Sequence, residues 1–419
     1  MALKVIDKDP QKNSALLDTP LNLVAESIST QLFSEQIASM KARTKVEYST
    51  NISEHFQGLP EQRKSGMILH KLLDIITISI CGIICGANDW GQIETFGNAK
   101  KDWLKSFLEL PNGIPSHDTF NRVLNSLSAK KFQECFASWM QSLVTLTDGE
   151  IVAIDGKCLR HSYDKKSDKS AIYMVSAWAS ENQVVLGQVK TDEKSNEITA
   201  IPKLLDLLNI KGCIVTIDAA GCQTKIAHTI KECEADYVLA LKGNQGTLHE
   251  DVKLYFEYAL NRKFKNIEHS YHETLEGDHG RIETRRYWTI DHIDWLESKD
   301  KWTGLSSIGM VESIREMDGK ISIEKRFYIS SLSSDAQRFG HAVRQHWGVE
   351  NSLHWSLDVT FNEDYSRIRA DQGAENFAVL RHIALSLLKK ETSHKRGIAN
   401  KRLKAALDSD YLLKVLTAK

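Results

Sequence analysis

The sequence has no excess of charge of either sign. Its 54 lysine and arginine residues are balanced by 55 aspartate and glutamate residues, which gives a formal net charge of −1 at pH 7. An overall basic charge, the usual electrostatic sign of a nucleic-acid-binding domain, is therefore missing. Any affinity for nucleic acid must come from local groups of basic residues.

Long apolar runs and paired cysteines are missing as well. The most apolar stretch, residues 72–87, contains Asp74 and other polar residues, and it is shorter than the roughly 20 apolar residues that a membrane span needs. The seven cysteines include no C-x-x-C pair, and no secretory leader is apparent. These absences predict a cytoplasmic protein with reduced thiols and no membrane partner.

The most informative stretch is E-I-V-A-I-D-G-K-C-L-R at residues 150–160. Its apolar, β-branched run predicts a buried strand that ends on Asp155, followed by Gly156. The pattern recurs in C-I-V-T-I-D at residues 213–218, which ends on Asp218. Either acid alone could simply cap the turn that follows it. Because an unpaired carboxylate is costly to bury, the two acids together favour a cation site.

The hydrophobic periodicity divides the 419 residues into six parts, enough for two or three domains. In order, these are a polar arm with one helix near 21–42 (1–45), a helical domain (46–148), the first part of an α/β core (149–245), a β-rich insertion (246–335), the acidic and final helices of the core (336–390) and a basic tail (391–419). Within the helical domain, residues 115–127 predict a short capped helix after a turn. It could be the second helix of a DNA-binding helix-turn-helix, or a member of a plain helical bundle.

From residue 150 onward, the predicted order of elements is β-β-β-α-β-α-β. The strands are expected at 150–158, 172–180, 184–190, 213–218 and 236–241, and the helices at 200–208 and 223–234. This is the order of the α/β ribonuclease-H-like fold, in which the first and fourth strands lie side by side and carry acids. Asp155 and Asp218 fall on those two strands.

A β-rich insertion delays the helix that would complete the site. After a helix at 248–260, strands are predicted at 270–275, 280–290, 307–317 and 320–330, with the hairpin signal Asp318-Gly319 between the last two. A long helix then begins near Asp335 and carries His346, Glu350 and His354 on one face, because residues four apart share a side of a helix. A final helix is predicted at 372–390.

Asp155, Asp218 and Glu350 would together form an oxygen-rich site of the kind that Mg²⁺ or Mn²⁺ prefers. Two such cations, roughly 3.5–4 Å apart, can activate a water or a 3′-hydroxyl and stabilise the leaving oxygen of a phosphodiester. The predicted chemistry is therefore in-line phosphoryl transfer, which needs no serine or cysteine nucleophile.

Two alternatives for the acidic helix remain open. His346, Glu350 and His354 could hold zinc, although the usual H-E-x-x-H motif is absent. Asp358 or Asp364 could replace Glu350 as the third acid, although Asp358 lies about 80° round the helix from Glu350.

Basic and amide side chains lie near the three acids in the sequence. The candidate DNA-binding residues are Lys157, Arg160, Lys242, Asn244, Arg281, Arg285, Arg286, His346, Asn351 and His354. Lysine and arginine interleaved with aromatic residues suit phosphate contact and base stacking. Any single arginine among them could belong to a solvated strand face, but the cluster favours DNA.

Five segments occur in an order that resembles a known family. They are A-I-D-G-K (153–157), T-I-D-A-A-G-C-Q (216–223), D-Y-V-L-A-L-K-G-N-Q (236–245), H-G-R-I-E-T-R (279–285) and H-W-G-V-E-N-S-L-H-W-S-L-D-V (346–359). They resemble the H-repeat-associated group of bacterial insertion-sequence transposases, in the DDE superfamily. The resemblance covers nearly the whole chain.

The resemblance implies a ribonuclease-H-like mixed sheet flanked by helices, with a β-rich insertion and an all-helical N-terminal domain. It implies an Mg²⁺- or Mn²⁺-dependent transposase that acts as a homodimer on double-stranded DNA, at terminal inverted repeats and target DNA, in the bacterial cytoplasm at the nucleoid. The positions that match the catalytic and metal-binding triad are Asp155, Asp218 and Glu350.

The chain departs from the better-studied cut-and-paste relatives around Glu350. Those carry a Tyr, an Arg and a Lys at fixed spacing, where this chain has Val343, His346 and Leu357. His346 could replace the Arg as a phosphate contact, but the role of the Lys is unassigned, so whether hairpins form at the DNA ends stays open. A nuclease without strand transfer and a non-enzymatic DNA-binding remnant remain alternative hypotheses, and the intact triad argues against the remnant.

Overall fold

The computed structural model describes residues 52–163, 170–191, 197–278, 281–317 and 319–417. Three sequence predictions lie outside these residues: the polar arm with its helix near 21–42, most of the charged turn after Tyr163, and Asp318 of the predicted hairpin.

A single mixed sheet runs through the described part of the chain, in the strand order β3-β2-β1-β4-β5-β9-β8-β7-β6. The strands are β1 (Ile151–Leu159), β2 (Ile172–Ala179), β3 (Val184–Lys190), β4 (Ile214–Ile217), β5 (Asp236–Leu241), β6 (Ser270–Asp278), β7 (Arg281–Ile290), β8 (Ser307–Met317) and β9 (Lys320–Ser330). β1, β4 and β5 are parallel, and the other neighbouring pairs are antiparallel. The five strands predicted between 150 and 241 are confirmed within one residue at each end.

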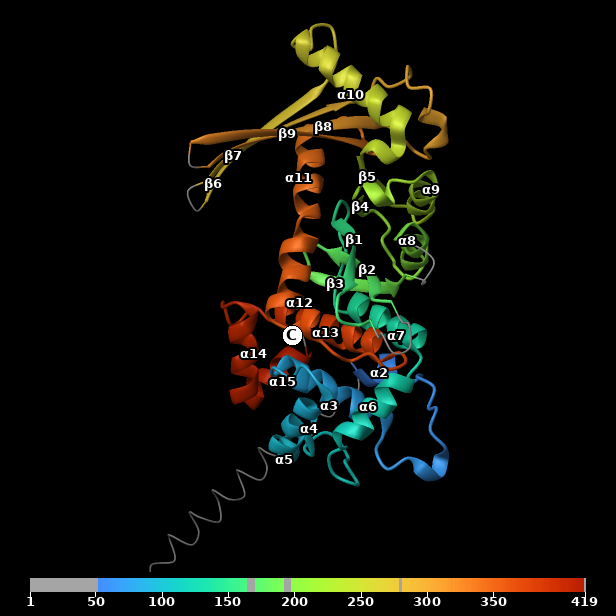
Figure 1. Ribbon diagram of the computed structural model, residues 1–419, viewed down its shortest axis with the longest axis vertical. Coiled ribbons are helices and arrows are strands. Elements are labelled where there is room, and N and C mark those ends of the chain that lie inside the picture. Colours follow the sequence, from blue (N-terminus) through green and yellow to red (C-terminus); the bar gives the residue numbers. More distant parts are fainter. Residues whose placement is uncertain (1–51, 164–169, 192–196, 279–280, 318, 418–419) are drawn as a thin grey trace, which may run out of the picture.

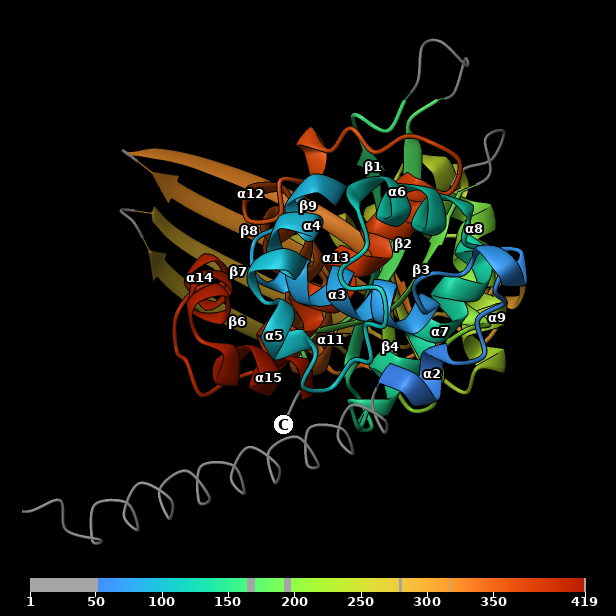
Figure 2. The ribbon, with the colours of Figure 1, turned by 90° about the horizontal axis from the view of Figure 1, so that it is seen from below.

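The β-rich insertion continues the sheet of the core. β9 pairs with the edge of β5, with Val238 opposite Ser330 and Leu241 opposite Phe327. This pairing satisfies backbone groups that would otherwise be exposed along the edge of β5. Figures 1 and 2 both show β6–β9 projecting to one side, away from most of the helices. We call strands β6–β9 the β-extension.

Helices cover both faces of the core strands. α8 (Glu197–Leu205), α9 (Thr224–Glu232) and α10 (Gly246–Asn261) lie on one face, and α11 (Ala336–His346) lies on the other. Side chains alternate along a strand, so Val152 and Ile154 of β1 pack towards α8 and α9, whereas Ile151 packs towards α11. Asp155 has the parity of Ile151 and therefore faces the side of α11.

The helix that follows the β-extension is not uniformly α-helical. α11 leads into a π-helical segment, η6 (Val349–His354), and then into α12 (Trp355–Val359). π-helical turns are rare and occur most often at functional sites. Glu350 lies within this segment.

The N-terminal helices share one core with the C-terminal helices. The elements involved are α2 (Glu54–Phe56), α3 (Leu72–Ile84), α4 (Trp90–Ala99), α5 (Lys101–Leu104), α6 (His117–Ser126), α7 (Ala129–Ser142), α13 (Gly373–Lys390), α14 (Ile398–Leu407) and α15 (Ser409–Thr417). They form the lower block in Figure 1. The capped helix predicted after Pro115 is α6, where Ser116 Oγ accepts from the N–H of Thr119. Asn376 of α13 donates to the carbonyls of Leu124 and Leu127, so α6 packs against α13.

Two of the cations in the basic stretch after residue 390 are buried. Lys401 donates to the carbonyl of Leu388 at 2.8 Å, and Arg402 donates to the carbonyl of Ile83 at 2.9 Å. The guanidinium of Arg402 also lies 4.2 Å from the ring centroid of Phe361. These contacts fix α14 and α15 against the body of the protein. Among the described residues, no helix is long and apolar enough to span a membrane.

Candidate active site

Two of the three predicted acids lie where the parallel pairing of β1 with β4 ends. Asp155 is the fifth residue of β1, and β1 pairs with β4 up to Ile154 and Ile217. Asp218 follows β4 directly and caps the short 3-10 helix η3 (Ala219–Gly221), where its Oδ1 accepts from the N–H of Ala220 at 3.0 Å. The capping role considered as an alternative for Asp218 is therefore real, and its second oxygen stays available.

The pKa of Asp155 is affected by the charges of the other acids. The pKa of Asp155 is raised to about 7; burial is the largest cause, the Gly156 N–H opposes it, and the negative charges of Asp218, Glu197 and Glu350 add to it. The predicted triad is therefore close enough for mutual repulsion. Asp358 and Asp364, the rival third acids, are instead paired with Lys157 and Arg160.

Glu197 is an acid that sequence reasoning missed. It is the first described residue of α8, and its carboxylate lies against β1: a Cβ added at Gly156 would stand 2.0 Å from Glu197 Oε1. Burial and the charge of Asp218 raise the pKa of Glu197. Acids are common at helix N-termini for electrostatic reasons alone, so the position of Glu197 in the sequence does not mark it as a site residue. The only signal in the sequence is Gly156, because a residue without a side chain lets the Glu197 carboxylate come close to β1.

Two histidines of the acidic helix lie against the strands that precede or carry the aspartates. His346 Nδ1 lies 3.0 Å from Thr216 Oγ1 on β4, and His354 Nδ1 lies 3.5 Å from Asp155 Oδ2 on β1. Burial, together with the charge of Lys157, lowers the pKa of His354 to about 4, so its ring is neutral at pH 7. Burial also lowers the pKa of His346. Both histidines can therefore act as neutral hydrogen-bonding groups.

His346, Glu350 and His354 do not share one face in the way that an ideal α-helix predicts. His346 and Glu350 line the same hollow, whereas His354 is buried against β1. The π-helical turn between them changes the angle per residue, which explains the difference. Within the described ranges, no three His, Cys, Asp or Glu side chains stand together as a metal-binding group, so the zinc alternative gains no support.

The acids fit a hard divalent cation in chemistry and charge. Carboxylate oxygens are the ligands that Mg²⁺ and Mn²⁺ prefer, and a cation would offset the repulsion that acts on Asp155. Asp155, Asp218 and Glu350 would hold it, with Glu197 beside them. As they stand in the described part of the chain, these acids do not form a group of three that could hold a metal ion.

Lys157, a predicted DNA contact, pairs with acidic side chains of the protein itself. Its ammonium donates to Glu363 Oε2 at 2.7 Å and to Asp358 Oδ1, and its side chain is only 12% exposed. Burial alone would lower the pKa of Lys157, but the charges of Glu363 and Asp358 outweigh burial and raise it. The ammonium therefore links β1 to α12 and to the turn that follows. Arg160 pairs with Asp364 at 3.2 Å, so both rival acids are engaged by bases.

The remaining candidate DNA-binding residues fall into three places. Lys242 and Asn244 line a cavity of about 640 Å³ together with Glu197 and Asp218. Arg281, Arg285 and Asn351 line a second hollow, of about 250 Å³, which also contains Glu350. Arg286 lies on the opposite face of the β-extension, paired with Glu273 at 2.7 Å and Glu312 at 3.3 Å. The structure thus brings only some of these residues towards the acids.

Comparisons with known proteins identify the family. Residues 146–387 match the family described as "Transposase DDE domain", and residues 53–140 match the one described as "DDE_Tnp_1-associated". The chain therefore belongs to the DDE transposases. Within them it belongs to the H-repeat-associated group, as the five sequence segments predicted.

Two curated relatives support this assignment. The chain is 43% identical to the "H repeat-associated putative transposase YhhI" of Escherichia coli K12 over 370 residues, which cover 87% of this chain and 97% of that protein. It is 44% identical to the "Putative transposase YncI" of Escherichia coli O157:H7 over 373 residues, 88% of this chain and 95% of that protein. A solved piggyBac transposase synaptic complex with hairpin DNA aligns with 87% of this chain and 77% of its own, at 12% identity and a TM-score of 0.39, too low to support a conclusion.

Proposed function

We propose that this DDE transposase cuts and joins double-stranded DNA at the terminal inverted repeats of an insertion sequence, with Asp155, Asp218 and Glu350 as its catalytic acids. The observation that carries the proposal is the charge coupling at Asp155: Asp218 and Glu350, far apart in the sequence, both raise its pKa. Perturbed carboxylates on facing elements are typical of catalytic sites. The rival acids Asp358 and Asp364 are instead paired with Lys157 and Arg160.

The proposal includes a ribonuclease-H-like catalytic core built from residues 149–245 and 336–390. It is supported by the order β3-β2-β1-β4-β5, with an antiparallel meander followed by two parallel strands, and by acids on the adjacent strands β1 and β4. The helical region 46–148 and the insertion 246–335 would be the DNA-contacting accessories of this core.

The acids and histidines would have distinct tasks in the reaction. Mg²⁺ or Mn²⁺, when bound, would activate the attacking oxygen and neutralise charge on the phosphodiester. Asp155, Asp218 and Glu350 would hold the cation in place. His354 and His346, both with lowered pKa values, would fix η6 against β1 and β4 without adding positive charge. This fixation matters because catalysis of this kind depends on positioning.

The test is a cleavage and joining assay with purified protein, Mg²⁺ and labelled DNA that carries the element's ends. Wild type should nick at the ends and join the released 3′ ends to target DNA, while Asp155→Asn and Glu350→Gln should do neither. Cleavage without joined products would establish a nuclease in place of a transposase. Specific DNA binding without cleavage under Mg²⁺ or Mn²⁺ would establish a binding remnant.

We also propose that the active complex contains a homodimer on paired DNA ends. Sedimentation of the cleavage-competent complex measures this directly. A complex of one protein chain with one DNA end would contradict the dimer.

A further inference from the structure

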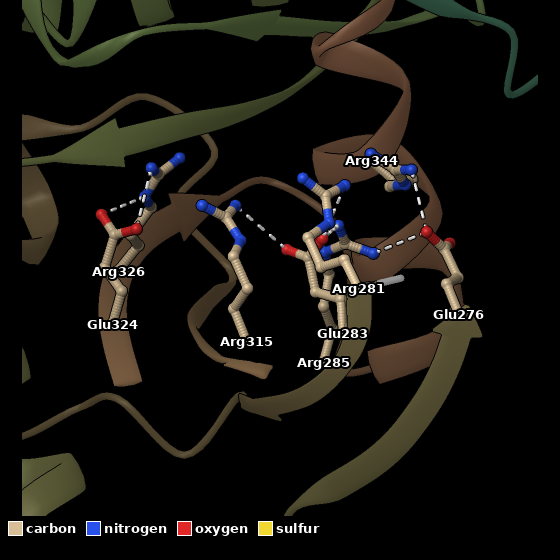
Figure 3. Close-up of polar contacts among 8 residues, drawn as sticks. All are labelled: Glu276, Arg281, Glu283, Arg285, Arg315, Glu324, Arg326 and Arg344. Atoms are coloured by element: carbon tan, nitrogen blue, oxygen red, sulfur yellow. Dashed lines mark hydrogen bonds and ion pairs between the residues drawn. The ribbon is translucent and has the colours of Figure 1, made fainter. Parts of the chain in front are cut away.

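The inner face of the β-extension, which faces α11, carries five arginines around one hollow. They are Arg281 and Arg285 on β7, Arg315 on β8, Arg326 on β9 and Arg344 near the end of α11 (Figure 3). Three of them, Arg315, Arg326 and Arg344, are separated widely in the sequence from the basic segment around Arg285. Sequence reasoning missed these three because only the strand pairing and the docking of α11 bring them together.

One buried carboxylate organises three of these arginines. Glu283 is only 5% exposed, and its oxygens lie 2.7 Å from Arg285 Nη2, 3.3 Å from Arg281 Nη2 and 3.4 Å from Arg315 Nη2. Arg285 reaches on to Glu276, which also pairs with Arg344 at 2.9 Å. A guanidinium held in this way loses little further freedom when it binds a ligand.

The inner face keeps a surplus of positive charge. Five guanidinium groups meet three partner carboxylates, from Glu276, Glu283 and Glu324, and Glu350 also lines the hollow, so five positive and four negative charges leave a net charge of +1. Each guanidinium has five N–H donors, so the ion pairs leave many of them unused. The side chains of Arg281, Arg315 and Arg344 are 44–50% exposed and can reach a ligand. Arginine forks match phosphate groups in geometry as well as charge.

The arginine hollow leads to the acidic site. Glu350 and Asn351 line it together with Arg326, whose guanidinium lies 4.8 Å from the ring centroid of Trp347. Arg326, Trp347 and Glu350 also line the next hollow, whose wall contains Asp218 and Lys242. A chain of phosphates laid along the inner face would therefore end at Glu350 and Asp218.

We infer that the inner face of the β-extension binds the sugar-phosphate backbone of the DNA strand that enters the acidic site, with Arg281, Arg315, Arg326 and Arg344 as phosphate contacts. Glu283 and Arg285 act as positioning residues that hold these contacts in place. The contacts are to phosphate, so binding through this face is independent of base sequence and depends on salt. The inference rests on the proposed function for the meaning of the acidic site, but the binding surface can be tested without catalysis.

The outer face of the same strands supplies a matched control. Arg286 follows Arg285 on β7 and points away from the hollow, because successive side chains of a strand point to opposite faces. It has two acidic partners on that face, Glu273 and Glu312. Its side chain is 40% exposed, close to the 44% of Arg344. An arginine with similar exposure thus lies on each face.

The experiment measures binding of a fluorescein-labelled DNA duplex of arbitrary sequence by fluorescence anisotropy, in EDTA, over a range of salt concentrations. Each phosphate contact removed should lower the slope of log K against log salt by about 0.9. Arg315→Gln and Arg344→Gln should each show this loss, the double variant about twice the loss, and Arg286→Gln none. Arg344→Lys, which keeps the charge, should retain most of the slope, and thermal unfolding should show each variant folded.

The inference is overturned if Arg315→Gln and Arg344→Gln bind as wild type does, or if Arg286→Gln weakens binding as much as they do. Its failure is distinct from failure of the proposed function, because EDTA removes catalysis from the measurement. If DNA binding by the Glu350→Gln protein still depends on the inner-face arginines, the inferred binding surface is supported even when no cleavage is observed.

Discussion

Replacing Asp155 with asparagine should stabilise the protein in the absence of divalent cations, although it removes a catalytic acid. Burial and three neighbouring carboxylates raise the pKa of Asp155 from 3.8 to about 7. The pKa of Asp155 is higher in the folded protein than in the unfolded chain. The free energy of unfolding is therefore not lowered by this group below about pH 4, and it falls progressively as the pH rises towards 7.

The size of the effect follows from the pKa difference. Three pKa units at about 1.36 kcal/mol each correspond to about 4 kcal/mol of unfolding free energy once Asp155 is ionised in the folded protein. Asparagine has nearly the same shape and no charge, so the variant should escape this loss. Its advantage over wild type should therefore grow from about pH 5 to about pH 8, by on the order of 2–4 kcal/mol.

Urea denaturation in EDTA at a series of pH values measures the difference. Asp300→Asn, at an exposed acid far from the site in sequence, is the matched control and should leave the unfolding free energy unchanged. Added Mg²⁺ should then stabilise wild type more than Asp155→Asn, since the ion binds the folded state through this carboxylate. A stability difference between Asp155→Asn and wild type that stays constant with pH would refute the account of coupled, buried acids.

Three further substitutions test the structure around the site. Lys157→Met leaves buried carboxylates without their cation and should cost about 3–5 kcal/mol in urea denaturation; a lysine that served only to bind DNA would leave stability unchanged. Gly156→Ala would displace the flexible end of the Glu197 side chain, so it should cost less than about 1 kcal/mol, and adding Glu197→Ala should remove that cost; a loss of several kcal/mol would contradict this contact. Gly309→Ala would put a Cβ 2.5 Å from Phe339 Cζ, so it should loosen the packing of α11 on the sheet. The free energy of unfolding should fall by about 1–3 kcal/mol, and the thermal midpoint should fall with it. An unchanged midpoint would contradict the packing.

The parts of the fold that the sequence predicted are those set by local pattern. β1 and β4 were predictable because a β-branched run closed by an acid is a local signal, and the acids then had to meet where the strands are neighbours. The β8–β9 hairpin was predictable from turn chemistry, and Met317 does pair with Lys320.

The parts that the sequence did not predict depend on distant pairings. Nothing near β9 indicates that it extends the edge of β5, and nothing near Arg286 indicates that it faces away from the acids while Arg285 faces towards them. Register decides which face each residue takes, and a shift of one residue would exchange them. The burial of Lys157 likewise depends on Glu363, more than two hundred residues later in the chain.

The most direct test of the central claim compares Mg²⁺-dependent cleavage of DNA ends by Glu350→Gln and Asp358→Asn. Both substitutions remove one negative charge from the same helical segment, but Glu350 is among the charges that raise the pKa of Asp155, whereas Asp358 is paired with Lys157. The account predicts that Glu350→Gln loses at least about a hundredfold in rate, equivalent to a few kcal/mol of transition-state stabilisation, and that Asp358→Asn stays within about tenfold of wild type. Cleavage that survives in Glu350→Gln and is lost in a folded Asp358→Asn protein would contradict the assignment of the third acid.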